Sequence, residues 1–267
     1  MQRRVMFPIL AYIGDFALKS YYVINIIGVI AGFIVLSLNI KNLAKGTKRK
    51  TLFFAAFIFI PFITGARLGN TLDSLINHTP ICASRYLIWG PVSLWWGLVL
   101  ATVLAFPIAK MFETDVWETA DLFAPSIAIG GVFARLACLS EGCCFGLPCP
   151  DTIPGALFTS ISPAYAQFPG KLLYPTQIYE SFSWLVIFVV LILYRKHRTF
   201  RGELIITLAA LYSAARFSIE FVRFHEKPAF LSVAQIWSIV IFATSLFLYF
   251  YFKKHGINKI KQTGKSI

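Results

Sequence analysis

Four ionisable residues lie inside stretches that are otherwise hydrophobic enough to cross a bilayer: Arg67, Arg135, Arg216 and Glu220. An ion in hydrocarbon is costly, so such residues usually face the interior of a helix bundle, where they are paired and serve a function. Three of them are arginines, whose planar guanidinium group donates two parallel hydrogen bonds to a phosphate or a carboxylate. This combination predicts a membrane protein that binds an anionic group such as a lipid headgroup.

The segment LYSAARFSIEFVRF, residues 211–224, carries polar side chains at helical spacing. Tyr212, Arg216 and Glu220 are four residues apart, and Arg223 follows after three more. On a helix these positions share one stripe. We interpret the stripe as a binding surface, because ions inside a membrane are usually functional. A structural ion pair between Arg216 and Glu220 is the alternative.

The other two arginines stand near the outward ends of their predicted spans. Gly65 and Gly69 flank Arg67 and would allow close helix approach. Arg67 or Arg135, taken alone, could simply extend its charged end to the interface. Three arginines on three spans, all toward one face, favour a shared site instead.

Four cysteines fall within twelve residues, and a fifth lies in another predicted outward loop: Cys138, Cys143, Cys144, Cys149 and Cys82. Their spacing lacks the Cys-x2-Cys pairs of a metal site and no histidine is near in sequence, so no metal is expected. Two interpretations stay open. One is a structural disulfide in an oxidising compartment. The other is a thiolate at Cys143 or Cys144, activated by Arg135, that attacks lipid covalently or exchanges electrons with a partner. The residues that follow, 145–148, are expected to form a turn.

Composition sets the class of protein. The chain has 267 residues, of which 57% are hydrophobic and only 14% charged, with a mean hydropathy of +0.69. Soluble domains carry about 25% charged residues, so we predict an all-α polytopic membrane protein with one domain over 1–267 and no nucleic-acid partner. Apolar windows of about 20 residues predict seven transmembrane helices. They fall near 21–40, 51–70, 87–109, 120–139, 176–194, 203–222 and 231–252.

Lysine and arginine are distributed unevenly between the predicted connections. Five lie in 41–50, one in 110–117, four in 195–202 and five in the tail 253–267, whereas the opposite side carries seven over longer segments. By the positive-inside rule, the C-terminus with its basic tail is cytoplasmic and the N-terminus lies outside. The loop 140–175, rich in cysteine, proline and glycine, is then extracytoplasmic.

Several segments, taken in order, resemble the prolipoprotein diacylglyceryl transferase family. They are IGDFALKSYY at 13–22, GARLG at 65–69, the stretch from Arg135 to Gly146, YPTQIYE at 174–180, Tyr212-x3-Arg216-x3-Glu220 and LSVAQIWS at 231–238. The resemblance implies a seven-span enzyme of the bacterial cytoplasmic (inner) membrane. Such an enzyme moves a diacylglyceryl group from phosphatidylglycerol to a lipobox cysteine. We expect a monomer without a cofactor.

The stripe, the cysteines and the resemblance together define the expected site. Catalytic roles are expected for Tyr21, Arg135, Arg216, Glu220, Cys143 and Cys144. Substrate contacts are expected from Arg67, Arg135, Tyr212, Arg216, Arg223, Gln177 and Gly146.

The chain also departs from the family pattern, which makes it a divergent member. The histidine of the third span is replaced by Trp95, which cannot accept a proton, and the signature asparagine and glutamate are replaced by Cys138 and Cys143. His225 is a candidate substitute base. Two other functions stay open: a membrane thiol-disulfide protein that uses the cysteine cluster, and a non-catalytic protein that binds anionic lipid.

Overall fold

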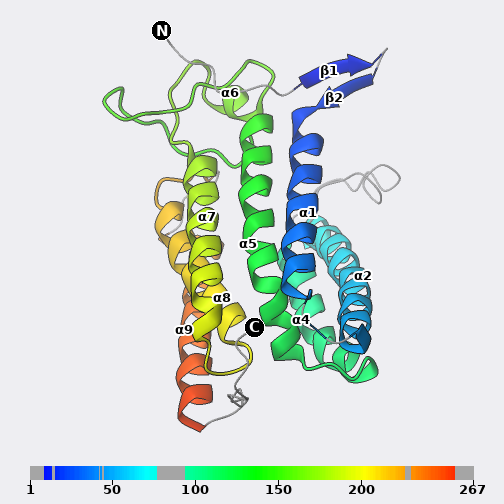
Figure 1. Cartoon of the computed structure of the whole chain (residues 1–267). Coiled ribbons are helices and arrows are strands. Elements are labelled where there is room, and N and C mark those ends of the chain that lie inside the picture. The colour runs from blue at the N-terminus through cyan, green and yellow to red at the C-terminus, as the bar shows by residue number, and fades with distance from the viewer. Residues whose placement is uncertain are drawn as a thin grey trace. The chain divides into compact units, whose positions relative to one another are not determined.

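A computed structural model describes residues 9–13, 16–41, 43, 45–76, 94–225 and 230–255 of the protein (Figure 1). The chain is mostly helical. Its helices are α1 (Ser20–Asn39), α2 (Lys45–Ile76), α4 (Leu94–Met111), α5 (Val116–Glu141), α6 (Pro163–Gln167), α7 (Thr176–Tyr194), the 3-10 turn η1 (Arg195–His197), α8 (Glu203–Glu220) and α9 (Val233–His255). The strands are β1 (Ile9–Ile13) and β2 (Phe16–Lys19). Cys82 and His78 lie outside the described residues.

Five helices in the described part of the chain are long and apolar enough to cross a membrane: α1, α2, α5, α7 and α9. The prediction of a polytopic helical membrane protein is confirmed. Two further helices occupy the other predicted spans. Of these, α4 has a shorter apolar part, Trp96–Met111, and α8 includes the ionisable residues Glu203, Arg216 and Glu220.

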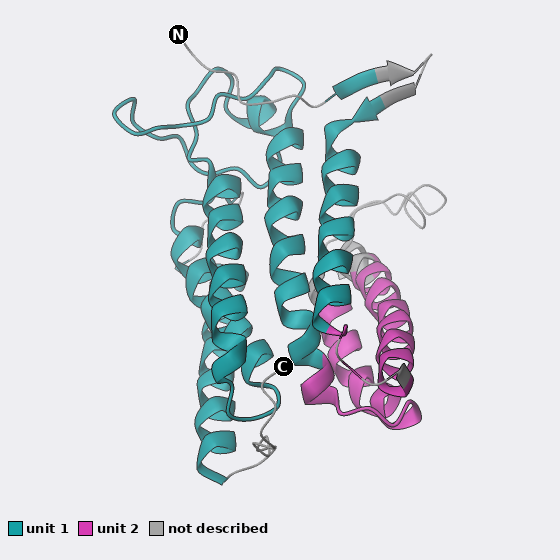
Figure 2. Cartoon of the chain, in the orientation of Figure 1, with its two compact units in different colours: residues 1–39, 120–267 teal, residues 40–119 magenta. Residues whose placement is uncertain are grey.

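The chain forms two compact units, which we describe separately (Figure 2). The smaller unit, residues 40–119, contains α2 and α4. These helices approach closely because glycines face backbone across the contact. A Cβ on Gly65 would lie 2.6 Å from the Trp96 carbonyl oxygen, and a Cβ on Gly97 would lie 2.7 Å from the Phe62 carbonyl oxygen. Small residues of this kind are typical of helix contacts in membranes.

The prediction of an all-α fold misses a short hairpin. Strands β1 and β2 pair antiparallel, with Ile9 opposite Lys19 and Ile13 opposite Phe16. The sequence carried a signal for it, because the pair Gly14-Asp15 between two apolar runs is typical of a hairpin connection. The apolar window that follows is a much stronger pattern, and the prediction therefore included its helix but not the hairpin.

The core of the larger unit, residues 1–39 and 120–267, lies between α5, α7 and α8. Alanines 124 and 128 of α5 are fully buried against Trp184, Ile187 and Leu191 of α7 and against Leu204 and Leu208 of α8. The Trp184 ring stacks on Tyr212 with centroids 4.3 Å apart. The small α5 residues let the three helices pack tightly enough to bring their polar side chains together.

A buried carboxylate of α5 holds the first turn of α8. Asp121, 1% exposed, accepts hydrogen bonds from the backbone N–H groups of Gly202, Leu204 and Ile205 at 2.8, 2.9 and 3.0 Å. Arg198 lies 3.3 Å from the same side chain. Because the N-cap residue Gly202 offers no side chain, Asp121 satisfies N–H groups that the helix itself leaves unpaired.

The segment between α5 and α7 has a small core of its own. Its buried residues are Leu139, Ala156, Phe158, Ala164 and Leu173. The prediction of a turn at 145–148 is wrong, because Gly146 and Pro148 form antiparallel β-bridges with Arg223 and Leu173. The bridge of Gly146 with Arg223 ties the segment to the chain beyond α8, whereas the bridge of Pro148 with Leu173 joins two parts of the segment itself.

Replacement of Asp121 tests the role of this carboxylate in the fold. Asp121→Asn keeps one acceptor oxygen but loses the charge opposite Arg198 and the helix N-terminus. We expect the free energy of unfolding to fall by about 3 kcal/mol, measured by detergent-titration unfolding. The matched control Asp151→Asn, at an exposed turn residue, should change it by less than about 0.5 kcal/mol. Equal losses for the two variants would contradict the assigned role.

Candidate functional site

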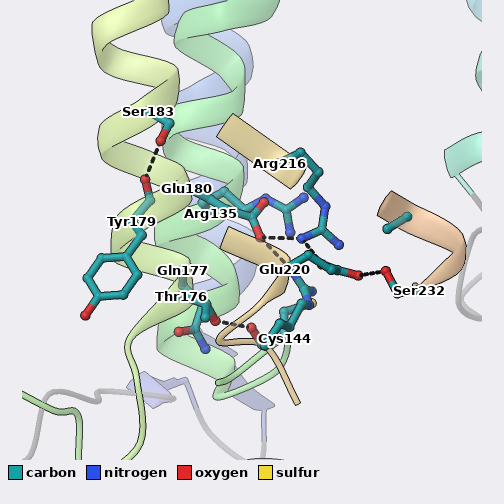
Figure 3. A network of polar contacts seen from close by, with 12 residues as sticks. Arg135, Cys144, Thr176, Gln177, Tyr179, Glu180, Ser183, Arg216, Glu220 and Ser232 are labelled. Atoms are coloured by element: carbon teal, nitrogen blue, oxygen red, sulfur yellow. Dashed lines mark hydrogen bonds and ion pairs between the residues drawn. The ribbon is translucent and has the colours of Figure 1, made fainter. Parts of the chain in front are cut away.

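Glu180 of α7 is the centre of a buried network of charges (Figure 3). Its side chain is 2% exposed and contacts three arginines. Arg135 Nε of α5 lies 2.7 Å from Oε2, Arg216 Nη1 of α8 lies 3.5 Å from Oε1, and Arg223 Nη1 donates a hydrogen bond to Oε1. One carboxylate therefore joins α5, α7, α8 and the segment that follows α8.

Glu220 forms the second acidic centre. It pairs with Arg216 one turn earlier on α8, so the predicted proximity of these two residues is confirmed. Ser232 Oγ donates to Glu220 Oε1 at 2.7 Å, and His225 Nε2 lies 3.2 Å from the same oxygen. Arg223 does not continue the helical stripe as predicted, because α8 ends at Glu220. It reaches the network from the bridge with Gly146 instead.

The network carries an excess of positive charge. Three guanidinium groups face two carboxylates, and the arginine side chains are only 10–18% exposed. Buried ions are tolerated only where opposite charges compensate them. One positive charge in excess therefore favours the binding of a singly charged anion such as a phosphodiester, which guanidinium groups bind through paired hydrogen bonds.

The two predicted tyrosines lie near different groups of the site. The Tyr212 ring stacks on Trp184 and is in electrostatic range of Arg135. Tyr21 of α1 is in electrostatic range of the thiols of Cys138, Cys143 and Cys144. The larger unit thus brings both phenols toward the groups that could hold a substrate.

Gln177 and Gly146 support the backbone around the site. Gln177 Nε2 donates to the Cys143 carbonyl at 2.7 Å, and its buried Oε1 has no hydrogen-bond partner among the described residues. A Cβ on Gly146 would lie 2.6 Å from Tyr174 Cβ and 2.7 Å from the Val222 carbonyl oxygen. Close packing of backbone therefore explains this glycine. Their substrate contacts remain predictions.

Arg67 and Trp95 belong to the smaller unit. Arg67 is a half-buried residue of α2, and Trp95 lies in the first turn of α4. The substrate contact expected from Arg67 remains a prediction.

The turn at the end of α5 explains why Cys138 lies close to Cys143 and Cys144, which follow the helix. Gly142 has a positive φ of 71°. The N–H of Cys143 donates to the Cys138 carbonyl at 3.2 Å, and the N–H of Gly142 donates to the Leu139 carbonyl at 3.2 Å. These two bonds define a Schellman motif, which usually needs glycine at the left-handed position. The turn folds Cys143 back beneath Cys138.

The sulfur atoms of Cys138, Cys143 and Cys144 consequently all lie within 4.8 Å of one another. No disulfide joins the four cysteines of the described residues. Cys144 itself has a positive φ of 61°, an uncommon backbone conformation for a residue with a side chain. Hydrogen bonds from the other two thiols, with the charges of Arg223 and Arg135, lower the pKa of Cys144.

Comparison with known proteins identifies the family of the chain. The family model described as prolipoprotein diacylglyceryl transferase matches residues 8–251. The chain belongs to this family. The predicted resemblance is thereby confirmed over most of the sequence.

Curated relatives of this family member come from several bacteria. Phosphatidylglycerol–prolipoprotein diacylglyceryl transferase 2 of Clostridium perfringens is 28% identical over 263 residues, which cover 94% of this chain and 96% of that protein. The Clostridium kluyveri transferase is 28% identical over 94% of this chain and 98% of its own length. The Campylobacter curvus transferase is 35% identical over 60% of this chain and 57% of that protein.

Glu180 of this family member is a site residue without an expected role in the sequence. The residue stands in the YPTQIYE segment and, like the arginines, is an ion at the start of an apolar span. The rule that singled out Arg135 and Arg216 therefore applied to Glu180 as well. Its three partners are distant in sequence, however, and only the fold brings them to one carboxylate.

Glu180→Gln tests whether the network depends on this carboxylate. The variant leaves three buried guanidinium groups with one acidic partner, so we expect the free energy of unfolding to fall by about 3–5 kcal/mol. Glu141→Gln is the control, because it removes only the partly exposed ion pair with Lys19, a type of pair that contributes about 0–1 kcal/mol. A small, equal effect of both variants in detergent-titration unfolding would contradict the central role of Glu180.

Gly142→Ala tests the turn that assembles the cysteines. A side chain at this positive φ costs about 1 kcal/mol, which should appear as a loss of unfolding free energy. Gly130→Ala in α5 is the matched control, since an added Cβ meets nothing within 4 Å. It should be neutral or slightly stabilising. A neutral Gly142→Ala variant would show that the left-handed turn is not required.

Proposed function

We propose that the protein transfers the diacylglyceryl group of phosphatidylglycerol to the cysteine thiol of a prolipoprotein lipobox. Family membership and the names of the relatives support this activity. The observation that carries the proposal is the buried network of three arginines with one positive charge in excess. Phosphatidylglycerol offers a matching group, because its phosphodiester carries a single negative charge.

The arginines act at the step in which the lipid is cleaved. Attack by sulfur on the glycerol carbon expels glycerol phosphate, whose phosphate then gains a second negative charge. Fixed guanidinium groups stabilise this developing charge more than they stabilise the bound lipid, which is the requirement for catalysis. Glu180 and Glu220 hold Arg135 and Arg216 in place, so little reorganisation is needed as the charge develops.

The membrane arrangement follows from the same proposal. The seven predicted spans comprise the five long apolar helices together with α4 and α8, and the two compact units serve as one functional domain in a monomer. With the basic tail 253–267 on the cytoplasmic side of a bacterial cytoplasmic membrane, the loop 140–175 and the cysteine cluster lie toward the outer face. A prolipoprotein that crosses the membrane presents its lipobox cysteine on that side.

Arg135→Ala tests the phosphate-binding role. The assay combines purified protein in phosphatidylglycerol vesicles with a synthetic lipobox peptide, and mass spectrometry detects diacylglyceryl addition to the peptide. We expect the transfer rate to fall by about 100-fold or more. Arg135→Lys keeps the charge but loses the planar fork, so an intermediate rate is expected.

Arg201→Ala provides the matched control at an exposed arginine between α7 and α8, and it should retain the wild-type rate. Full activity of Arg135→Ala would overturn the assigned role. A wild-type protein that binds phosphatidylglycerol but leaves the peptide unmodified would overturn the transferase proposal in favour of a lipid-binding function.

A further inference from the structure

The proposed reaction requires a deprotonated acceptor thiol, and the family histidine that could take the proton is replaced by Trp95. Beside the arginine network stand three thiols that the reaction as described does not use. Cys138 lies in the last turn of α5, and Cys143 and Cys144 follow directly after the Schellman turn. Their position next to the phosphate-binding groups raises the question of how they contribute to thiol chemistry.

The three sulfur atoms have the dimensions of a metal-binding set. All lie within 4.8 Å of one another. A tetrahedral Zn²⁺ with zinc–sulfur bonds of about 2.3 Å places its sulfur ligands about 3.8 Å apart. Closure around the ion therefore needs movements of about 1 Å or less, within the reach of side-chain rotation.

The backbone that presents these thiols is held from outside the turn. Gln177 Nε2 donates to the Cys143 carbonyl at 2.7 Å. Thr176 Oγ1 donates to the Cys144 carbonyl at 2.7 Å (Figure 3). Both donors lie in the first turn of α7, Thr176 four residues and Gln177 three residues before Glu180. Such support from a rigid element is what preorganised metal sites require.

The three thiols leave one ligand position of a tetrahedral metal ion open. No histidine, carboxylate or fourth cysteine joins the three thiols within the part of the chain that the structure describes. Structural zinc sites are closed by four protein ligands, whereas catalytic zinc sites have three and keep one position open. Zn²⁺ with three thiolates carries one negative charge, and it would lie close to the guanidinium groups of Arg223 and Arg135, which are in electrostatic range of Cys144.

We propose that Cys138, Cys143 and Cys144 bind one Zn²⁺ whose open position takes the thiol of the acceptor cysteine. The inference rests on the proposed function, since it assigns the activation of the acceptor in that reaction. A thiol that coordinates zinc is deprotonated outright near neutral pH. The metal thereby supplies what a general base would otherwise supply, and Trp95 in place of the histidine ceases to be an obstacle.

The step is balanced without a change of oxidation state. The acceptor thiol displaces water from Zn²⁺ and releases its proton to water. Its sulfur attacks the glycerol carbon that bears the phosphate oxygen. A C–S bond forms as the C–O bond breaks, and the electron pair of the C–O bond leaves with glycerol phosphate beside the arginines.

Cobalt(II) is the probe for the metal site, because thiolate–cobalt coordination absorbs strongly where Zn²⁺ is silent. We expect reduced, full-length protein in detergent to bind one Co²⁺ with sulfur-to-cobalt charge-transfer absorption, and Zn²⁺ to displace it. Single Cys→Ser changes at residues 138, 143 and 144 should weaken Co²⁺ binding at least tenfold. The matched control Cys149→Ser should bind as the wild type does.

Cys143→His guards against loss of folding in the serine variants, since imidazole is also a zinc ligand. It should restore Co²⁺ binding with an altered spectrum. Absence of charge-transfer absorption in the wild type, or equal damage from Cys149→Ser and Cys143→Ser, would overturn the site. A disulfide among the three cysteines in protein isolated without reductant would also overturn it and support thiol-disulfide chemistry.

The open position is tested with the lipobox peptide. Adding the cysteine peptide should increase the charge-transfer absorption of the cobalt protein, because a fourth sulfur joins the ion, and the Cys→Ser peptide should not. Removal of zinc by a chelator should lower the transfer rate at least tenfold, and return of zinc should restore it. An unchanged cobalt spectrum with the cysteine peptide, or full transfer by metal-free protein, would overturn thiol activation by zinc.

Failure of the proposed function would look different. Absence of transfer in both loaded and metal-free protein, with the cobalt spectra as expected, would overturn the transferase and leave the metal site supported.

Discussion

A single carboxylate, Glu180, imposes the constraint on which the larger unit depends. Apolar helices gain little by choosing one partner over another in a membrane, because lipid is as apolar as their side chains. A buried glutamate that contacts three arginines permits far fewer arrangements. The small residues of α5 and the stack of Trp184 on Tyr212 then fill the space that this arrangement leaves.

The chemistry of the site gathers where helices end. α5 stops at the Gly142 turn and α8 stops at Glu220, and the chain beyond each helix is joined by the bridge between Gly146 and Arg223. Anion-binding groups and thiols thus come both from facing helices, near their ends, and from the chain segments that follow those helices. The proposed transfer requires this proximity, since the thiol must attack the same carbon from which glycerol phosphate departs.

The sequence predicted the apolar spans and the residues that stand out within them, because hydropathy and burial of ions act locally. It placed Arg216 and Glu220 together correctly from their spacing. It did not place Arg223, which lies beyond the end of α8, or the three thiols, which meet through a left-handed turn. Periodicity describes positions within a helix, whereas a helix end and a contact between distant helices depend on the tertiary fold.

The position of Glu180 also affects how the chain enters the bilayer. Synthesis proceeds from the N-terminus, so Arg135 in α5 arrives before Glu180 in α7 has been made. An arginine at the centre of a span disfavours insertion by about 2.5–3.5 kcal/mol, and Arg135, nearer the end of α5, adds a smaller cost of the same kind until Glu180 follows. The ion pair between Arg135 and Glu180 offsets this cost once α7 has been made, and therefore favours retention of α5 in the membrane.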